Sequence, residues 1–235
     1  MKDLILGLVA ARAGSKGVKS KNLQEINGQS LIQIAISKLI KSNLIHTTII
    51  SSDSQEMIDE GMRYGAKEIG LRNSYLSNDQ TGKFDVWKDA VKQAEEKFNL
   101  KFDYLVDVDC TNPFVTIEDI EESMRLMQDN RCDVIIPICK SKRNPYFNIV
   151  EKREDGTIFP SKIGSQEGFI LSRQSAPSTW DHYAGVYVIR RDFLMNSNHF
   201  FDGSVVGHEM TPSKCLDIDT EEDLEYARFL AAKFL

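Results

Sequence analysis

Residues 4–11 (LILGLVAA) form a nearly continuous apolar run close to the start of the chain. A strand with one face in water alternates apolar and polar residues, whereas this run shows no alternation and must be covered on both faces. Residues 30–41 follow with apolar side chains at helical spacing, and residues 46–51 (HTTIIS) then form a second candidate strand. This strand–loop–helix–strand order predicts a layered α/β fold with a mostly parallel sheet.

Strands and helices continue to alternate along most of the chain. We predict helices over residues 57–64, 87–98, 117–128 and 220–233, and strands over residues 104–108, 133–139 and 186–189. Residues 140–178 depart from this pattern, because they hold three prolines, several glycines and short alternating pieces. We therefore expect residues 1–235 to form one domain, with residues 140–178 as a β-rich excursion from the main sheet.

The composition is that of an ordinary globular protein. Hydrophobic residues make up 41% of the 235 residues and charged residues 27%. The formal net charge of −6 argues against a nucleic-acid-binding surface, and the first apolar run is too short for a signal or membrane segment. The four cysteines show no spacing typical of zinc sites, and we expect free thiols in a reducing cytosol. We expect a cytoplasmic protein with neither nucleic-acid nor membrane partners.

The polar loop after the first strand, residues 12–22, combines glycines with several cations. Gly14 and Gly17 allow backbone N–H groups to turn toward an anion, and basic side chains on the same loop would neutralise it. The loop follows the C-terminal end of a strand, where ligands bind in open α/β sheets. It matches neither the P-loop pattern nor GxGxxG. An ordinary solvated loop is the alternative interpretation.

Two pairs of aspartates could act together. Asp217 and Asp219 are separated by one residue at the end of a strand-like piece, residues 215–218, so both carboxylates could face one side and share a hard cation. The alternative is an acidic helix start, since Thr220 is a natural cap. Asp107 and Asp109 lie at the end of a predicted strand that faces the same cleft, although Asp107 could merely form a cap or pair with a lysine.

Five motifs follow one another along almost the whole chain. The loop reads R-x-G-S-K-G-x-x-x-K-N from Arg12 to Asn22, and residues 72–79 (RNSYLSND), 144–148 (NPYFN), 173–177 (RQSAP) and 217–220 (DIDT) follow it. In sequence and in order these motifs resemble those of the CMP-sugar synthetases, the cytidylyltransferases that activate sialic acid and related nonulosonic or octulosonic acids. The resemblance implies a three-layer, Rossmann-like nucleotidyltransferase fold, with residues 140–178 used in dimerisation.

The resemblance also implies roles for individual residues. Phosphate and nucleotide contacts would come from Ala11, Arg12, Gly14, Ser15, Lys16, Lys21, Asn22 and Arg72. Mg²⁺ on the triphosphate would be held by Asp217 and Asp219. Together with Arg12 and Lys16, these two aspartates would form the catalytic set. A general base cannot be identified from the sequence.

On the sugar side the chain departs from the common pattern. Asp109 stands where many sialic acid synthetases have a glutamine that contacts the sugar acid, and a carboxylate cannot donate a hydrogen bond as an amide does. It would either recognise different sugar substituents or help to hold metal. Arg173 and Gln174 match residues near the sugar acid, and Tyr183 stands where Asn is common. Asp109 and Tyr183 favour the branch that activates legionaminic-type acids.

The resulting hypothesis is an enzyme that joins CMP from CTP to the anomeric hydroxyl of a nonulosonic acid and releases pyrophosphate. The acid would be of the legionaminic or N-acylneuraminic type, and the enzyme would be a homodimer. The alternatives are a nucleotidyltransferase for another triphosphate, for an octulosonic acid or for a hexose phosphate. An inactive nucleotide-binding assembly protein is a further alternative, which the intact Arg12, Lys16, Asp217 and Asp219 argue against.

Overall fold

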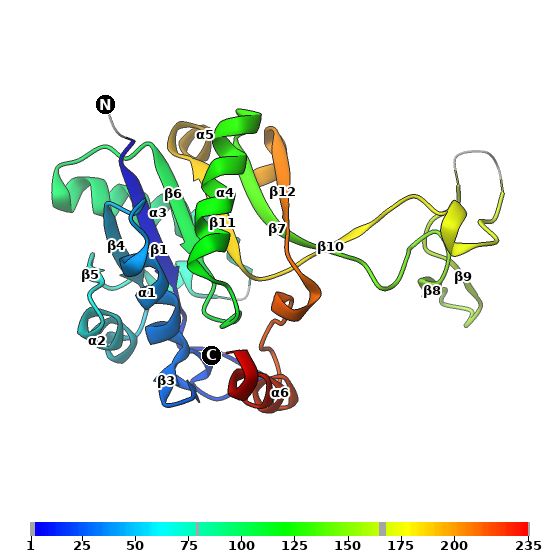
Figure 1. Cartoon of the computed structure of the whole chain (residues 1–235), viewed down its shortest axis with the longest axis horizontal. Coiled ribbons are helices and arrows are strands. Elements are labelled where there is room, and N and C mark those ends of the chain that lie inside the picture. Colours follow the sequence, from blue (N-terminus) through cyan, green and yellow to red (C-terminus); the bar gives the residue numbers. More distant parts are fainter. Residues whose placement is uncertain (1–2, 79, 165–167, 235) are drawn as a thin grey trace.

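A computed structural model describes residues 3–78, 80–164 and 168–234. Its centre is an eight-stranded sheet in which the strands pair in the order β10-β7-β11-β6-β1-β4-β5, and β12 also pairs with β7 (Figure 1). The strands are β1 (Ile5–Ala10), β4 (Thr47–Ser51), β5 (Lys67–Glu68), β6 (Tyr104–Val108), β7 (Val134–Lys140), β10 (Trp180–His182), β11 (Val186–Arg190) and β12 (Val205–Glu209). β2 (Glu25–Ile26) pairs with β3 (Gln29–Ser30) outside this sheet.

Most strands of the central sheet run in one direction, as predicted. β1 is parallel to both β4 and β6, β4 is parallel to β5, and β12 is parallel to β7. β11 is antiparallel to both β6 and β7, and β10 is antiparallel to β7. The C-terminal ends of β1, β4 and β6 therefore lie at the same edge of the sheet, where ligands bind in folds of this kind.

Helices cover both faces of the sheet and make the fold three-layered. Six helices are present in the described residues: α1 (Leu31–Lys41), α2 (Gln55–Arg63), α3 (Lys83–Phe98), α4 (Ile117–Asn130), α5 (Arg191–Asn196) and α6 (Glu221–Phe234). One core joins the sheet to α1, α2, α4 and α6, and a second core joins the opposite face to α3 and α5. No helix in the described ranges is both long and apolar enough to cross a bilayer.

The apolar run of β1 supplies both cores at once. Ile5 and Val9 belong to the α1/α4 core, whereas Leu6 and Leu8 belong to the α3 core. Because successive side chains of a strand point to opposite faces, burial on both sides removes the alternation that a half-exposed strand would show. This packing is the physical reason that the unbroken run predicted a central strand correctly.

Two expectations about the elements were wrong, and several elements, among them β5, α5 and β12, were not predicted. α3 begins at Lys83 rather than at residue 87, because Phe84 extends its apolar face by one turn. Gly82, at the N-cap, has no side chain that could cap the helix, so the sequence shows no capping residue there. β12 was missed; it is an edge strand that, among the described strands, pairs with β7 alone. Residues 215–219, all described, run as an irregular segment after the turn η5 (Pro212–Lys214), so the expected strand-like piece is not a strand.

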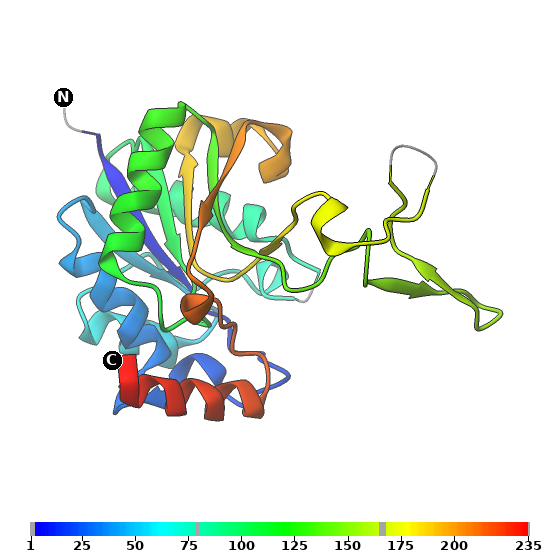
Figure 2. The same ribbon diagram turned by 45° about the vertical axis from the view of Figure 1, so that its right-hand side comes forward.

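An arm leaves the sheet after β7 and returns at β10, and Figures 1 and 2 show it projecting away from the body. It holds the antiparallel pair β8 (Val150–Lys152) and β9 (Ile158–Pro160), followed by the 3₁₀ turn η3 (Arg173–Ser175). Several of its large apolar side chains are exposed, among them Ile158, Phe169 and Leu171, the last retaining 88% of its accessible surface. The expected excursion thus exists as an antiparallel unit outside the main sheet.

All four cysteines lie in the described ranges and are unpaired, as expected. Cys110, Cys132 and Cys139 are buried, and Cys215 is half-buried. They contribute to the core as small apolar side chains rather than as covalent links.

Candidate active site

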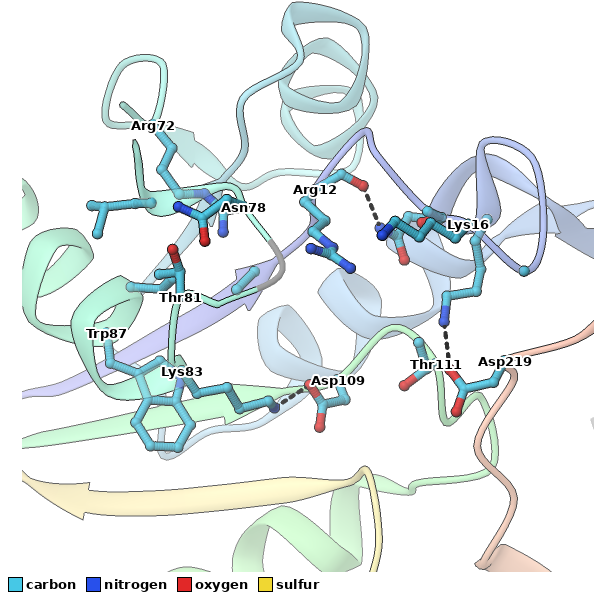
Figure 3. A pocket seen from close by; sticks show the side chains of 17 residues that line it. Arg12, Lys16, Arg72, Asn78, Thr81, Lys83, Trp87, Asp109, Thr111 and Asp219 are labelled. Carbon is cyan, nitrogen blue, oxygen red and sulfur yellow. Dashed lines mark hydrogen bonds and ion pairs between the residues drawn. The ribbon is translucent and has the colours of Figure 1, made fainter. Parts of the chain in front are cut away.

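A cleft of about 440 Å³ opens at the edge of the sheet where β1 and β6 end (Figure 3). It is lined by the loop after β1, by the start of α3, by the end of β6 and by the segment before α6. The lining residues are Ala10, Arg12, Ser15, Lys16, Gly17, Lys21, Asn22, Arg72, Leu76, Asn78, Thr81, Lys83, Val86, Trp87, Asp109, Thr111 and Asp219. The topology therefore brings most of the predicted site residues together.

Arg72 and Asn22 hold the loop in place. The buried Arg72 guanidinium donates hydrogen bonds to the carbonyls of Ala11 (2.7 Å) and Ser51 (2.9 Å), which joins the ends of β1 and β4. Burial lowers the pKa of Arg72, and the charges of nearby aspartates oppose that shift. The Asn22 amide donates to the Arg12 carbonyl at 3.2 Å. Both side chains shape the loop through its backbone in addition to lining the cleft.

Arg12, Ser15 and Lys16 extend along one wall of the cleft, where Figure 3 shows both cations directed toward its open volume. Gly14 belongs to the same loop, but a Cβ there would meet no described atom within 4 Å. Contact with the rest of the chain therefore does not require glycine at this position. A requirement for Gly14 would have to come from a bound ligand.

Gly17 is required by the fold itself. A Cβ at this position would lie 1.9 Å from the backbone oxygen of Asp219, far inside any real contact. The Lys21 ammonium spans the same junction, because it donates to the Ile218 carbonyl at 2.6 Å and to the Asp219 carboxylate at 3.0 Å. The cationic loop and the Asp219 segment are thus packed directly against each other, although about two hundred residues separate them.

Asp217 and Asp219 flank Ile218, whose side chain is fully buried in the core. Asp219 is 70% exposed and lines the cleft, whereas Asp217 lies deeper and outside the cleft lining. One carboxylate oxygen of Asp217, Oδ1, is buried without a hydrogen-bond partner among the described residues. Burial, together with the negative charges of Asp219 and Asp109, raises the pKa of Asp217. No larger cluster of potential metal ligands occurs in the described parts of the chain.

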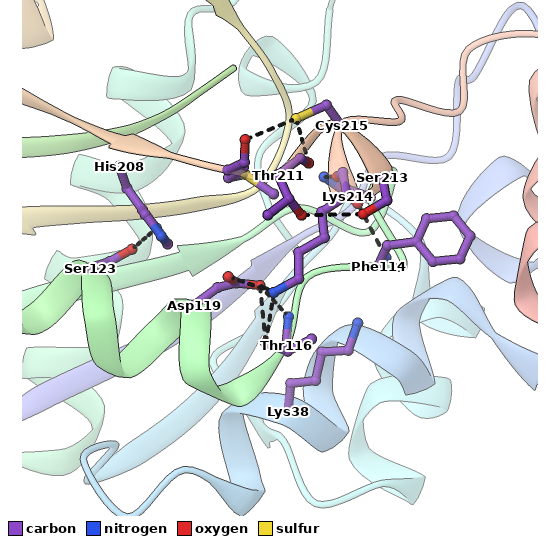
Figure 4. Close-up of polar contacts among 12 residues, drawn as sticks. Lys38, Phe114, Thr116, Asp119, Ser123, His208, Thr211, Ser213, Lys214 and Cys215 are labelled. Atoms are coloured by element: carbon purple, nitrogen blue, oxygen red, sulfur yellow. Dashed lines mark hydrogen bonds and ion pairs between the residues drawn. The ribbon is translucent and has the colours of Figure 1, made fainter. Parts of the chain in front are cut away.

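The segment before Asp217 is anchored to α4 (Figure 4). The Lys214 ammonium contacts both carboxylate oxygens of Asp119 at 2.8 and 2.7 Å and the Thr116 hydroxyl at 3.2 Å. The buried Asn112 amide donates to the Lys214 carbonyl at 2.8 Å and to the Ala184 carbonyl at 2.7 Å. These contacts hold the irregular segment in position without a strand.

Asp107 and Asp109 both pair with Lys83, the first residue of α3. The Lys83 ammonium forms an ion pair with Asp109 Oδ1 and lies 3.3 Å from Asp107 Oδ2. Burial would lower the pKa of Lys83, but the two carboxylates outweigh it and raise the pKa. Burial raises the pKa of Asp107 to about 6, despite the opposing charge of Lys83. The lysine pairing considered for Asp107 is therefore present, and it includes Asp109.

Three predicted sugar-side residues lie outside the cleft of the single chain. Arg173 and Gln174 belong to η3 on the arm, where Arg173 donates to the Lys142 carbonyl at 2.9 Å. Tyr183 follows β10, and its carbonyl accepts a hydrogen bond from the Tyr187 hydroxyl at 3.2 Å. Asp79, the last residue of the second motif, falls outside the described residues.

Several lining residues were not predicted: Asn78, Thr81, Lys83, Trp87 and Thr111. Asn78 belongs to the motif 72–79, which marked the region but identified only Arg72. A helix starting at Phe84 would have been detectable, because Phe84, Trp87 and Val91 fall at helical spacing. Lys83 would then have stood at the helix start, next to the cleft. The proximity of Thr111 follows from the turn after β6 and has no separate sequence signal.

Comparison with known proteins agrees with this geometry. The cytidylyltransferase family matches residues 6–232. The chain is 35% identical over 226 residues to CMP-N,N'-diacetyllegionaminic acid synthase of Campylobacter jejuni, covering 96% of this chain and 94% of that one. It is 34% identical, with the same coverage, to post-translational flagellin modification protein B of Campylobacter coli.

Solved structures show the same fold at low sequence identity. CMP:2-keto-3-deoxy-manno-octonic acid synthetase, determined in complex with CTP, aligns with a TM-score of 0.71 at 17% identity, over 99% of this chain and 100% of that one. 4-diphosphocytidyl-2C-methyl-D-erythritol synthase of Anaerococcus prevotii aligns with a TM-score of 0.66 at 14% identity, over 99% and 97% of the two chains. The motifs, the fold and the family match lead to one conclusion: the chain belongs to the cytidylyltransferase family of CMP-sugar synthetases.

Proposed function

We propose that this protein transfers CMP from CTP to the anomeric hydroxyl of a legionaminic-type nonulosonic acid and releases pyrophosphate. The relative named CMP-N,N'-diacetyllegionaminic acid synthase supports this substrate pair, as it is similar over almost the full length of both chains. The structural neighbour solved with CTP supports the choice of nucleotide. Asp109 and Tyr183, which depart from the usual sialic acid pattern, favour the legionaminic type.

The observation that carries the proposal is the contact between the cationic loop and the Asp219 segment. Gly17 packs against the Asp219 backbone, and Lys21 bridges to the Asp219 carboxylate. Cations and carboxylates thereby occupy adjacent walls of one cleft (Figure 3). A triphosphate with its counter-cation requires such an arrangement, because its oxygens need positive charge on one side and a held metal on the other.

In the proposed reaction, the anomeric oxygen attacks the α-phosphorus of CTP and loses its proton. The bond from the α-phosphorus to the bridging oxygen breaks, and pyrophosphate leaves with the electron pair of that bond. Arg12 and Lys16 would bind the phosphates and neutralise the charge that develops on them, while Lys21 and Asn22 hold the loop in shape. Positioning and electrostatic stabilisation would supply most of the rate enhancement.

Asp217 and Asp219 fit a divalent cation, for which we propose Mg²⁺. The buried, unpartnered Oδ1 of Asp217 needs a positive partner, and the mutual repulsion of the two carboxylates would be relieved by a cation. Lys21 engages one oxygen of Asp219 and leaves the other available. Mg²⁺ commonly takes one or two carboxylates plus substrate phosphates. When bound, it would polarise the α-phosphate and neutralise the leaving pyrophosphate.

We further propose that the enzyme is a homodimer and that the arm forms the contact. The arm exposes large apolar side chains, including Ile158, Phe169 and Leu171, which a second copy would cover. Arg173 and Gln174 lie on this arm, outside the cleft of their own chain. In a dimer they would serve the neighbouring cleft, where Arg173 could bind a sugar carboxylate. Sedimentation at working concentration tests the dimer, and a monomer would contradict it.

Pyrophosphate release tests the proposed reaction. The protein is incubated with Mg²⁺, with each of the four nucleoside triphosphates, and with N,N'-diacetyllegionaminic, N-acetylneuraminic and octulosonic acids in turn. We expect turnover with CTP, fastest with the legionaminic acid, and loss of turnover when the metal is chelated. Turnover with another triphosphate would show that the enzyme uses a nucleobase other than cytosine. Turnover with none of the pairs would contradict the assignment as an enzyme. The cytoplasmic location expected from the sequence stays a prediction.

A further inference from the structure

Lys83 occupies an unusual position at the base of the cleft. It is the first residue of α3 and lines the cleft together with Asp109, as Figure 3 shows. Its ammonium pairs with Asp109 and Asp107 and lies 4.2 Å from the centre of the Tyr187 ring. The side chain still retains 43% of its accessible surface. An ammonium has three donor hydrogens, so Lys83 can serve these carboxylates and still donate into the cleft.

Lys83 also determines what Asp109 can do. One oxygen of Asp109 pairs with Lys83, and the other accepts the Gly185 backbone N–H at 3.3 Å. A metal ion at this carboxylate would have to displace an ammonium that is already paired there. Asp109 is therefore unsuited to metal binding, but each of its oxygens has a further lone pair for a neutral donor. Of the two roles considered for Asp109, the geometry favours contact with a sugar substituent.

The charge of this cluster points to a neutral substituent. One ammonium faces two carboxylates, so the group of Lys83, Asp107 and Asp109 carries a net charge of −1, or zero when Asp107 is protonated. Such a group does not attract the triphosphate or the carboxylate of a sugar acid. The strongly cationic wall with Arg12 and Lys16 lies elsewhere along the cleft (Figure 3). Charged parts of the substrates would therefore be placed away from Lys83.

We propose that Lys83 is a specificity-determining residue that presents, with Asp109, an adjacent donor and acceptor to an acylamino substituent of the sugar acid. Lys83 would donate to the amide carbonyl oxygen, and Asp109 would accept the amide N–H. Val86, three residues further along α3 and on the same helix face, lines the cleft and would contact the acyl methyl group. The proposal rests on the proposed function, since it assumes a nonulosonic acid in this cleft.

The test compares Lys83→Met with the wild-type enzyme on matched substrates. These are N,N'-diacetyllegionaminic acid and the two analogues in which one acetamido group is replaced by a hydroxyl. A site that hydrogen-bonds an amide discriminates strongly against an analogue that lacks it. We expect the wild type to prefer the diacetylated acid over one analogue by about 10²-fold in kcat/KM. Lys83→Met should reduce this preference to less than about 5-fold and raise the KM for the diacetylated acid.

Three controls separate recognition from a structural role. Lys92→Met removes an exposed lysine from the same helix, outside the cleft. It should change neither the preference in kcat/KM nor the KM for the diacetylated acid. Lys83→Arg, which keeps the charge and the donors, should recover part of the preference. The Kd of CTP, titrated without sugar, and the melting temperature report on the cleft and fold of each variant. In Lys83→Met the Kd of CTP should stay close to the wild-type value, whereas the melting temperature should fall, because Asp107 and Asp109 lose their ammonium partner.

The outcomes distinguish this proposal from the one on which it rests. If the wild type turns over the acid but Lys83→Met keeps the full preference, the subsite is wrong and the proposed function stands. The same conclusion follows if Lys83→Met raises the Kd of CTP by the same factor as the KM for the sugar acid, because Lys83 would then affect the cleft as a whole. If the wild type turns over none of the acids with CTP, both proposals fail together.

Discussion

Gly17→Ala is the substitution for which the structure predicts the largest effect from the smallest change. The new Cβ would lie 1.9 Å from the backbone oxygen of Asp219, about 1.1 Å inside the 3.0 Å that real Cβ atoms keep. Both atoms belong to, or are attached directly to, the main chain, so no flexible side chain can absorb the overlap. The cationic loop and the Asp219 segment must therefore separate by about 1 Å or more.

The size of the effect follows from that displacement. A misplacement of about 1 Å commonly lowers the rate of an enzyme about 10²-fold, because the reacting groups are no longer aligned. This corresponds to about 2.7 kcal/mol of transition-state free energy. The Lys21 contact across the same junction, 3.0 Å to Asp219 Oδ1, would be lengthened too. The predicted metal carboxylate and the predicted phosphate cations would thus lose their relative placement.

Pyrophosphate release with CTP and the best sugar acid measures this loss. Gly82→Ala is the matched control, because a Cβ there meets no described atom within 4 Å and Gly82 has an ordinary backbone conformation, with φ at −69°. We expect the control to stay within about threefold of the wild type. If Gly17→Ala turns over as fast as Gly82→Ala, the contact between loop and Asp219 segment does not organise catalysis, and the reasoning is refuted.

Three further predictions concern carboxylates in the site and beside it. Asp219→Asn should lower the rate at least about 10²-fold and raise the Mg²⁺ concentration that gives half the maximal rate. Asp109→Asn should leave that Mg²⁺ concentration within about twofold of the wild-type value. Equal shifts in the two variants would contradict a metal-binding role for Asp219 that Asp109 does not share. Asp107 has a pKa of about 6 in the fold, above its ordinary value of 3.8. The free energy of unfolding of the wild type, measured by urea denaturation, should therefore fall relative to that of Asp107→Asn as the pH rises from 4 through 6. If the two proteins show the same dependence of this free energy on pH, the prediction is refuted. Lys214→Met should cost about 2 kcal/mol in urea denaturation, because it leaves Asp119 without its ammonium partner; an unchanged midpoint would show that the ion pair contributes nothing.

The pH prediction depends on every charge around Asp107. Lys83 on α3 and Arg72 favour its ionised form, whereas Asp109 and burial favour the protonated form. Tyr187 on β11 stays neutral across the range, since burial raises its pKa. The carboxyl therefore gains its proton in the fold at a pH where the unfolded chain is still ionised. Stability from this group is complete below about pH 4 and lost above about pH 6.

Much of the fold was predictable because its signals are local. β1 lacks alternation since α1 and α3 pack on opposite faces of it, and α4 begins at Ile117 because Thr116 at its N-cap forms a capping box with Asp119. The start of α3 carried no such signal, since Gly82 at its N-cap makes no side-chain hydrogen bond. β12 was missed for another reason: its sequence, VVGHE, is only partly apolar, and most of its residues are half-buried at the edge of the sheet.

The candidate site, like the fold, has parts that local sequence patterns indicate and parts that they do not. Glycines and cations of one loop indicate an anion site, and the family motifs add Asp217 and Asp219. No local pattern reveals that Gly17 touches Asp219, because the contact joins opposite ends of the chain. The place of Lys83 at the start of α3 could have been predicted, but its pairing with Asp107 and Asp109 could not, because they lie more than twenty residues away on β6 and the turn after it. Residues whose role is a pairing across elements need the fold before they can be recognised.

The overall charge of −6 makes the distribution of charge within the cleft informative. An acidic protein that binds a triphosphate must gather cations locally, and the loop after β1 does so with Arg12 and Lys16. Elsewhere in the cleft, Lys21 pairs with Asp219 and Lys83 pairs with two carboxylates. The wall that carries Arg12 and Lys16 is the one proposed to bind the phosphates. A neutral sugar substituent beside Lys83 and a charged nucleotide beside Arg12 and Lys16 would then bind the same cleft without competing for the same cation.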